Sequence, residues 1–324
     1  MIVGASSPAP GRLVRANGID LHVLEAGVGP AVVLLHGFPE LAYSWRHQLP
    51  ALADAGYRAV APDMRGYGRS SRPEEVSAYG LDDLCGDVVG LLDALAIDKA
   101  VVVGHDWGAM VAWGVALRTP GRLHGVVGMS VPFIPRPTRP PVANFEARNP
   151  GVFFYISYFQ APGVADADLG ADPRTTVTRI LTAWAGGSSE GGVLGPDDGR
   201  GLVERIPEPG ALPTWITQEE LDVYVTEFAR TGFTGGINWY RNMDRNWERS
   251  AHLAGAKVEV PAFFIAGALD GAIRMWSPER MEGWLLDPRG TVLVEGAGHW
   301  VQQEQPAEVN TALVGFLDGL DLGG

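Results

Sequence analysis

Short, unbroken apolar runs recur along the chain and are separated by stretches with helical periodicity. The runs do not alternate apolar with polar residues, which is typical of strands buried on both faces of a mostly parallel sheet. They are Val32–Leu35, Ala59–Ala61, Val101–Val103, Val126–Met129, Phe263–Ala266 and Val292–Val294. Between Leu81 and Leu95, apolar residues repeat at the spacing of one helix face. This alternation predicts an α/β protein with helices on both faces of a central, mostly parallel sheet.

The pattern changes between residues 134 and 246, where aromatic and helical sequence replaces the strand-like runs. Thr217 and Glu220 form a capping-box pattern, which predicts a helix from there to Arg230. The Gly- and Pro-rich stretch from Gly186 to Pro213 predicts a long, mobile loop.

We therefore expect a helical cap (lid) at residues 134–246, inserted after the sixth strand into a core made of residues 1–133 and 247–324. The 324 residues suffice for one large domain with such an insertion. A cap over the strand ends would close a dry cleft at the place where open α/β sheets bind ligands.

Charge and cysteine content narrow the class of protein. With a formal net charge of −13, the chain offers no basic surface for nucleic acid or an anionic membrane. No apolar run reaches the length of a membrane span, and residues 1–10 lack the features of a signal peptide. Cys85 is the only cysteine, which rules out an intrachain disulfide and favours a cytoplasmic location. Lys99 and Lys257 are the only lysines among many arginines, which suggests a GC-rich bacterial gene.

Asp106 lies at the tip of a predicted sharp turn between a strand and a helix. Residues 104–108 read Gly-His-Asp-Trp-Gly, so small residues flank the acid. In the serine version of this turn, the nucleophile elbow, small residues let a strained backbone close and expose the nucleophile. A carboxylate can instead displace a leaving group from saturated carbon and become an ester. The predicted substrate is therefore an epoxide or a halide rather than a simple ester or amide.

His299 and Asp270 follow two later strands and are the candidates for a base and the acid that orients it. His299 comes after the run at Val292–Val294 and a glycine turn, which places it on a loop at a strand end. Asp270 directly follows the run at Phe263–Ala266, and the chain order nucleophile, acid, histidine is the one expected with such an elbow. An aspartate before a glycine is also a common turn former, so this second interpretation stays open.

Backbone N–H groups of Phe38 and Trp107 are the candidates for stabilising an oxyanion. Phe38 belongs to a His-Gly-Phe-Pro motif that directly follows an apolar strand, and Trp107 begins the helix after the elbow. Backbone donors need no reorganisation, and the helix N-terminus adds partial positive charge. The other residues of the motif, His36, Gly37 and Pro39, would shape the pocket loop, with His36 as a hydrogen-bonding scaffold rather than a base.

Opening an epoxide leaves an alkoxide, so the reaction needs a proton donor, and the predicted cap offers tyrosines. A phenol stays protonated at neutral pH. Tyr240 lies in the stretch 238–247 and Tyr155 in the aromatic stretch 153–160, where Tyr158 is a second choice. An aromatic helix stripe is equally typical of core packing, so the residues alone leave these roles open.

Together these motifs resemble the soluble epoxide hydrolase family of the α/β-hydrolase fold. The matching stretches are His36–Glu40, Gly104–Gly108, Tyr158–Gly163, Gly236–Asn242 and Gly298–Trp300. The resemblance extends from about residue 12 to about residue 318, nearly the whole chain. The acidic elbow is shared with haloalkane dehalogenases, whereas the motif around Tyr240 is much more specific.

The resemblance implies an enzyme that converts a small apolar epoxide and water to a vicinal diol. Asp106 would attack a ring carbon while Tyr155 and Tyr240 protonate the ring oxygen. His299, oriented by Asp270, would then activate the water that hydrolyses the ester.

Two departures from the family pattern bear on this assignment. Some relatives place the orienting acid after the sixth strand, where residues 129–131 (Met-Ser-Val) offer no carboxylate, and this favours Asp270. Ile156 stands where some relatives carry a polar residue, which bears on the polarity of the pocket.

Other classes of function remain as alternatives. A haloalkane or haloacid dehalogenase would share the nucleophile, base and acid but would need N–H donors around a halide. Fluoroacetate-type relatives carry arginine at the position of Trp107. A non-catalytic ligand-binding protein on the same scaffold would show losses in the catalytic set, and the sequence shows none. No metal-ligand spacing or phosphate-binding glycine motif is present, so no cofactor is expected. The natural epoxide, the choice between detoxification and biosynthesis, and the oligomeric state, a homo-oligomer included, stay open.

Overall fold

The computed structural model describes residues 11–186 and 194–322, and in these ranges the main sheet has eight strands. Their order across the sheet is β1-β2-β4-β3-β5-β6-β9-β10. The strands are β1 (Arg12–Ala16), β2 (Ile19–Ala26), β3 (Ala31–Leu35), β4 (Arg58–Pro62), β5 (Ala100–His105), β6 (Leu123–Met129), β9 (Val258–Gly267) and β10 (Leu285–Val294). β2 pairs antiparallel with β1 and β4, whereas the other neighbouring strands are parallel. The predicted mostly parallel sheet is confirmed.

Each apolar run of the sequence lies in one of the parallel strands. Both faces of β3, β4, β5, β6 and β9 are buried at these runs, whereas β10 is an edge strand and its Leu293 is 48% exposed. Val32 and Val33 are both fully buried, yet they belong to hydrophobic clusters on opposite faces of the sheet. β1 and β2 lack this signature and are missing from the sequence-based strands. In β1, Leu13 is exposed while its neighbour Val14 is buried, as expected for an edge strand with one solvated face.

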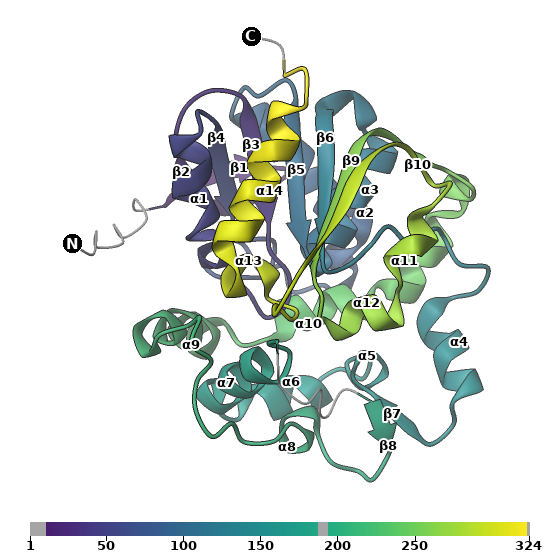
Figure 1. The fold of residues 1–324 in the computed structure, drawn as a ribbon. Coiled ribbons are helices and arrows are strands. Elements are labelled where there is room, and N and C mark those ends of the chain that lie inside the picture. Colours follow the sequence, from purple (N-terminus) through teal and green to yellow (C-terminus); the bar gives the residue numbers. More distant parts are fainter. Residues whose placement is uncertain (1–10, 187–193, 323–324) are drawn as a thin grey trace.

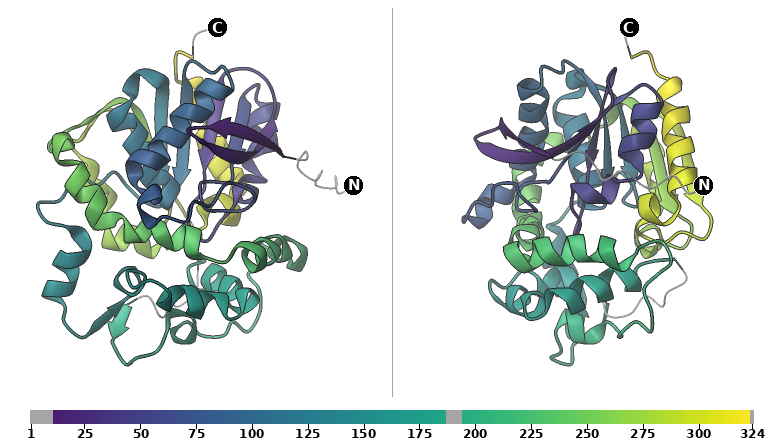
Figure 2. Two further views of the ribbon diagram at one scale, coloured as in Figure 1. Left: turned by 180° about the vertical axis from the view of Figure 1, so that it is seen from behind. Right: turned by 90° about the vertical axis from the view of Figure 1, so that its left-hand side faces the viewer.

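Helices cover both faces of the sheet, as the right-hand view of Figure 2 shows. The helices of this part are α1 (Gln48–Asp54), α2 (Leu81–Ala94), α3 (Trp107–Arg118), α12 (Gly271–Met275), α13 (Val301–Glu304) and α14 (Pro306–Asp318). Short 3-10 helices are η1 (Ala42–Trp45), η2 (Val76–Tyr79), η3 (Pro120–Arg122), η4 (Ala251–Leu253) and η5 (Pro278–Met281). Apolar residues of α1 and α14 join the cluster on one face, and those of α2 and α3 join the cluster on the other. The predicted three-layer α/β arrangement is therefore present.

The chain between β6 and β9 is mainly helical, and most of it lies beyond the carboxyl ends of the parallel strands (Figure 1). Its elements are α4 (Pro141–Arg148), β7 (Val152–Phe154), α5 (Tyr155–Tyr158), α6 (Val164–Gly170), α7 (Pro173–Ala183), β8 (Leu194–Pro196), α8 (Leu202–Arg205), α9 (Gln218–Thr231), α10 (Thr234–Arg241) and α11 (Met243–Arg249). The helix predicted from the capping box is α9, and both hydrogen bonds of the box are made. The division into core and cap at residues 134 and 246 stays a prediction, and residue 246 falls inside α11.

The loop predicted from Gly186 to Pro213 is only partly correct, and residues 187–193 lie outside the described residues. β8 pairs antiparallel with β7, and α8 follows it. Leu202 is fully buried, and the Arg205 guanidinium lies over the Phe153 ring, 3.9 Å from its centre. The prediction of a continuous loop is thus wrong at β8 and α8, whereas residues 197–201 and 206–213 belong to no helix or strand. Isolated apolar residues among glycines and prolines gain their partners only in the folded chain.

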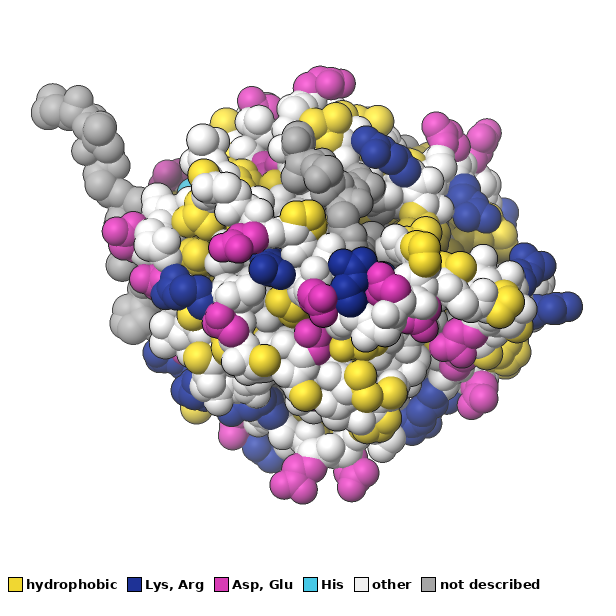
Figure 3. All heavy atoms as spheres, turned by 90° about the horizontal axis from the view of Figure 1, so that it is seen from below, with side chains coloured by type: hydrophobic (Ala, Val, Ile, Leu, Met, Phe, Trp, Pro, Cys, Tyr) yellow, Lys and Arg dark blue, Asp and Glu magenta, His cyan; other side chains and the backbone are white. Residues whose placement is uncertain are grey.

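Seen from the side of the helical segment, the surface intersperses side chains of both charges with small apolar spots (Figure 3). No helix in the described part of the chain is long and apolar enough to cross a membrane. Among residues 11–186 and 194–322, no group of three or more His, Cys, Asp or Glu side chains is placed to hold a metal ion. The face drawn in Figure 3 thus carries side chains of both charges rather than a patch of one sign.

Candidate active site

Asp106 occupies the turn between β5 and α3 with φ 52° and ψ −119°. L-residues rarely adopt a positive φ, so this backbone is strained and needs close neighbours without side chains. A Cβ atom on Gly104 would lie 2.0 Å from the carbonyl oxygen of Gly108. One on Gly108 would lie 2.0 Å from the carbonyl oxygen of Leu35. The two glycines therefore let β3, β5 and α3 approach and leave Asp106 at the tip of the elbow.

The loop after β3 contacts the elbow directly. The Phe38 N–H donates to Asp106 Oδ1 at 2.9 Å, and a Cβ on Gly37 would lie 2.3 Å from the same oxygen. His36 Nδ1 donates to the Gly37 carbonyl oxygen at 2.9 Å, while its Nε2 accepts a backbone N–H of the loop after β4, also at 2.9 Å. Pro39 follows Phe38 through a cis peptide bond. Both imidazole nitrogens of His36 are therefore used by the backbone of these loops.

His299 lies between two carboxylates. Its Nδ1 is 3.2 Å from both oxygens of Asp270, and its Nε2 is 3.7 Å from Asp106 Oδ2. Asp270 also accepts the Ala272 N–H at 2.8 Å, so the same side chain caps α12 and contacts the histidine. Ser130 stands in the loop after β6, where some relatives keep their acid, and its hydroxyl donates to the His299 carbonyl oxygen at 2.9 Å.

The two carboxylates control the charge of the imidazole. Burial lowers the pKa of His299, but the negative charges of Asp270 and Asp106 outweigh it and hold that pKa well above its usual value. Burial raises the pKa of Asp270, yet the charge and hydrogen bond of His299 leave it below its usual value. At neutral pH with Asp106 ionised, His299 is therefore an imidazolium.

Tyr155 in α5 and Tyr240 in α10 come from the helical segment, and their ring centres are 5.8 Å apart. Burial raises the pKa of both phenols, and the Asp106 charge raises it further. Trp107, the first residue of α3, packs edge-on against Tyr240 at 5.0 Å. Both phenols therefore stay protonated at neutral pH beside the elbow.

A cavity of about 100 Å³ lies among these groups. Its lining residues are Asp106, Val131, Tyr155, Trp184, Tyr240, Asp270, Gly271, Ala272, Met275, Trp276 and His299. The nucleophile, base, acid and tyrosine candidates of the sequence thus line one cavity. Tyr158, the second-choice tyrosine, is outside this lining, and its hydroxyl donates to Asp168 at 3.1 Å.

Trp184 is a site residue that the sequence analysis missed. Its ring lies 5.8 Å from that of His299 and 6.0 Å from that of Tyr155, and its carbonyl oxygen accepts the His299 N–H at 2.8 Å. A single tryptophan after a helix gives no local signal of such a contact, because its partners lie far away in the sequence.

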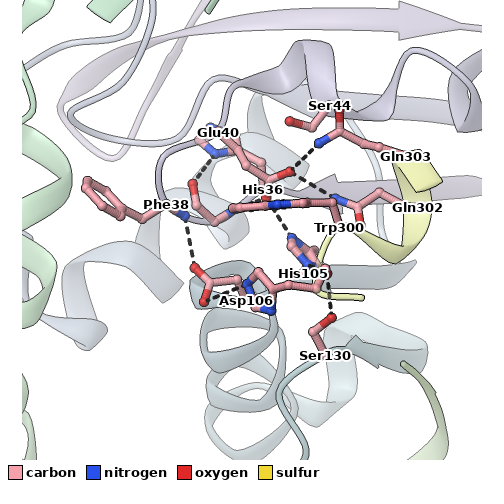
Figure 4. A network of polar contacts seen from close by, with 12 residues as sticks. His36, Phe38, Glu40, Ser44, His105, Asp106, Ser130, Trp300, Gln302 and Gln303 are labelled. Atoms are coloured by element: carbon pink, nitrogen blue, oxygen red, sulfur yellow. Dashed lines mark hydrogen bonds and ion pairs between the residues drawn. The ribbon is translucent and has the colours of Figure 1, made fainter. Parts of the chain in front are cut away.

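A buried ion pair lies behind the elbow (Figure 4). His105 Nδ1 is 2.6 Å from Glu40 Oε2, and its Nε2 donates to the His299 carbonyl oxygen at 2.7 Å. Glu40 also accepts the Gly37 N–H at 3.1 Å and two side-chain amides of α13 at 3.0 Å each. Burial raises the pKa of Glu40, but the charge and hydrogen bond of His105, the charge of His36 and the Gly37 N–H bring it down to about 2. With both ring nitrogens in contact with oxygens, His105 joins the loops around Asp106 and His299.

Comparison with known proteins agrees with this geometry. The family described as alpha/beta hydrolase fold matches residues 30–306. "Epoxide hydrolase A" of Mycobacterium tuberculosis is 52% identical over 96% of this chain and 98% of its own length. The "Epoxide hydrolase" of Caballeronia sordidicola is 44% identical over 95% of this chain and 93% of its own. The crystal structure of Epoxide Hydrolase A from Mycobacterium thermoresistibile has 52% identity and a TM-score of 0.93, covering 98% of this chain and 100% of that one.

The fold, the acidic elbow and the family match together define an α/β hydrolase. Within that class, the chain belongs to the epoxide hydrolase family. The resemblance and the fold class predicted from the sequence are both confirmed.

Proposed function

We propose that the protein hydrolyses a small apolar epoxide to a vicinal diol in two steps, through an ester on Asp106. The observation that carries this proposal is one cavity lined by a carboxylate, an imidazole with its orienting acid, and two phenols. Relatives named epoxide hydrolase, such as the one from Mycobacterium tuberculosis at 52% identity, support the same activity.

In the first step, Asp106 Oδ2 attacks a ring carbon of the epoxide. Oδ1 accepts the Phe38 N–H, so Oδ2 is the oxygen left for the attack. Tyr155 and Tyr240 donate to the ring oxygen, and one of them protonates it as the ring opens. The negative charge of Asp106 is one cause of their raised pKa. Because that charge disappears as the ester forms, both phenols become stronger acids when the proton is needed.

In the second step, His299 changes from an imidazolium to a base. Esterification removes the charge of Asp106, so only Asp270 still favours the protonated ring and the pKa of His299 falls. The imidazolium gives its proton, through solvent, to the phenolate left by ring opening. The neutral ring then takes a proton from water, and the resulting hydroxide attacks the ester carbonyl carbon. The oxyanion forms on Oδ1, where the N–H groups of Phe38 and Trp107 stabilise it. Collapse breaks the ester bond, His299 returns the proton to the leaving oxygen, and the diol departs. The neutral ring then takes the proton of the regenerated Asp106 carboxyl group, which restores the carboxylate and the imidazolium.

The remaining cavity wall favours an uncharged, apolar substrate. Besides the reacting groups, it presents the side chains of Val131, Trp184, Met275 and Trp276. Among the described residues, no Lys or Arg lines it, and the His299 imidazolium is already paired with Asp270 and Asp106, so an anionic epoxide would find no free cationic partner. We also propose a cytoplasmic location, since the one cysteine, Cys85, is buried and free.

The test is the intact mass of the His299→Gln variant after exposure to styrene oxide, 1,2-epoxyhexane and 1-bromohexane. This variant should form the ester but fail to hydrolyse it, so we expect an added mass of one whole epoxide on the Asp106 peptide. Asp106→Asn is the control, with no adduct and no turnover in freshly prepared, folded protein.

Other outcomes of this experiment would contradict the proposal. An added alkyl group without its halogen would indicate a dehalogenase. Folded protein without any adduct, combined with wild-type protein that forms no diol, would indicate a scaffold that only binds ligands.

A further inference from the structure

The loop that carries His299 is fastened to the helical segment through one carboxylate, Glu304. Glu304 Oε2 accepts the N–H of Gly186 at 2.7 Å and that of Gly298 at 2.9 Å, while Oε1 accepts the N–H of Trp300 at 2.9 Å. Gly298 and Trp300 flank His299, whereas Gly186 follows α7 and lies 118 residues before Glu304. One side chain thus binds the backbone on both sides of the histidine and the backbone of the helical segment.

Where residues 184–186 meet the loop that carries His299, the two backbones lie too close for side chains to fit between them. A Cβ atom on Gly298 would lie 2.3 Å from the Gly186 nitrogen, and one on Gly186 would lie 2.4 Å from the Gly296 carbonyl oxygen. The His299 N–H donates to the Trp184 carbonyl oxygen at 2.8 Å. The position of the histidine backbone therefore depends directly on the position of residues 184–186.

The contact between residues 184–186 and the loop of His299 also shapes the cavity. The Trp184 ring lines it and lies edge-on to the His299 ring at 5.8 Å. Trp300, next to His299, donates its indole N–H to the Leu181 carbonyl oxygen of α7 at 2.9 Å. Burial raises the pKa of Glu304 even though the three N–H donors oppose it. Burial thus disfavours the charged form of Glu304, and the groups that favour this form are the backbone N–H groups of Gly186, Gly298 and Trp300.

We propose that Glu304 is a positioning residue for ester hydrolysis, an inference that rests on the function proposed above. By holding residues 184–186 against the histidine loop, its carboxylate keeps the His299 imidazole within reach of water and of the Asp106 ester. Ester formation uses Asp106 and the two tyrosines, and the hydrogen bonds of Glu304 go to none of them. The effect of Glu304 falls on the second step.

The first test is the Glu304→Gln variant in single-turnover reactions with styrene oxide. An amide has one acceptor oxygen and an N–H₂ donor, so it cannot accept all three N–H groups. We expect ester hydrolysis to slow by about tenfold and ester formation to stay within about twofold of wild type. In the steady state, kcat and KM should then fall together while kcat/KM is nearly unchanged, and the ester should accumulate in the intact-mass spectrum.

Two further variants make this test specific. Glu308→Gln changes an exposed glutamate of α14 and should leave both steps unchanged. Gly186→Ala keeps Glu304 but places a Cβ 2.4 Å from the Gly296 carbonyl oxygen. Because this separates residues 184–186 from the loop of His299, it should also slow ester hydrolysis and leave ester formation unchanged. It also tests the proposal if Glu304→Gln fails to fold.

Equal slowing of both steps, or no slowing of either, in folded Glu304→Gln or Gly186→Ala protein would overturn the role of Glu304. Wild-type protein that forms no ester on Asp106 would overturn the proposed function itself. The two failures are therefore distinguishable in the same set of reactions.

Discussion

The two sides of the cavity are built by different means. On the sheet side, Asp106, Asp270 and His299 follow the carboxyl ends of β5, β9 and β10, and the backbone of parallel strands brings them together. On the helical side, Tyr155 and Tyr240 come from α5 and α10, separate elements that aromatic contacts hold together. The sheet side is therefore positioned by the backbone, and the helical side by side-chain packing.

This difference matches a division of the chemistry. In the mechanism proposed above, the groups on the sheet side form the ester and hydrolyse it, while the phenols on the helical side are needed only when the ring opens. Substitutions on the two sides should consequently slow different steps. A substitution that only weakens the folding of the helical side should leave the rates of both steps unchanged.

The largest effect is expected from Asp270→Asn on the sheet side. An amide supports the wrong tautomer of His299 and carries no charge, so ester hydrolysis should fall by about 10³-fold or more. Among the effects that raise the pKa of His299, the Asp270 charge is the largest, and its removal lowers this pKa. Since the hydrolysis step needs the neutral ring, its rate should rise with pH at a lower pH than in the wild type.

The measurement is the single-turnover rate of ester hydrolysis as a function of pH for both proteins. Ester formation, followed in the same reactions, is the internal control, because Asp106 and the tyrosines are unchanged. A pH profile that keeps its wild-type position would mean that Asp270 does not act through its charge.

A smaller effect is expected from Tyr240→Phe on the helical side. Phenylalanine keeps the edge-on ring contacts with Trp107 and Phe38 but removes the proton donor. Ester formation should slow by about 10²-fold, with ester hydrolysis within about twofold of wild type. Tyr158→Phe is the matched control, since that hydroxyl donates to Asp168 away from the cavity. If Tyr240→Phe slowed both steps equally, the two sides would not divide the chemistry.

The parts of the fold that sequence could predict are those with a local pattern. Buried parallel strands are continuous apolar runs, and α9 begins with a capping box at Thr217, so both are visible in the sequence. β1 and α8 are not visible in the sequence, because their few apolar residues form no periodic pattern and gain packing partners only from distant parts of the chain. Arg205 and Phe153, for example, meet across the helical segment.

The same distinction holds for the site. Asp106, Asp270 and His299 were predicted because a polar residue directly after a strand or glycine turn has a defined place in this class of fold. The tyrosines were assigned only through the family resemblance, since an aromatic stripe is equally typical of a core. Glu304 had no signal at all, because its contact with Gly186 joins residues 118 apart in the sequence.

The smallest effect concerns stability on the helical side. The Thr217 hydroxyl accepts the Glu220 N–H at 3.2 Å and caps α9, while Glu220 Oε1 accepts the Arg46 side chain at 2.7 Å and ties α9 to the loop after β3. Thr217→Ala removes only the cap, so the free energy of unfolding in urea should fall by about 1 kcal/mol. Thr311→Ala, at an exposed position within α14, should change it by less than about 0.5 kcal/mol.

Both steps of the reaction should stay within about twofold of wild type in Thr217→Ala, because α9 contributes no residue to the cavity wall. Tyr155 and Tyr240 would then keep their positions although the helical segment as a whole is weaker. If Thr217→Ala slowed ester formation as Tyr240→Phe does, the helical segment would move as one body. The position of the phenols would then depend on the whole segment rather than on their aromatic neighbours.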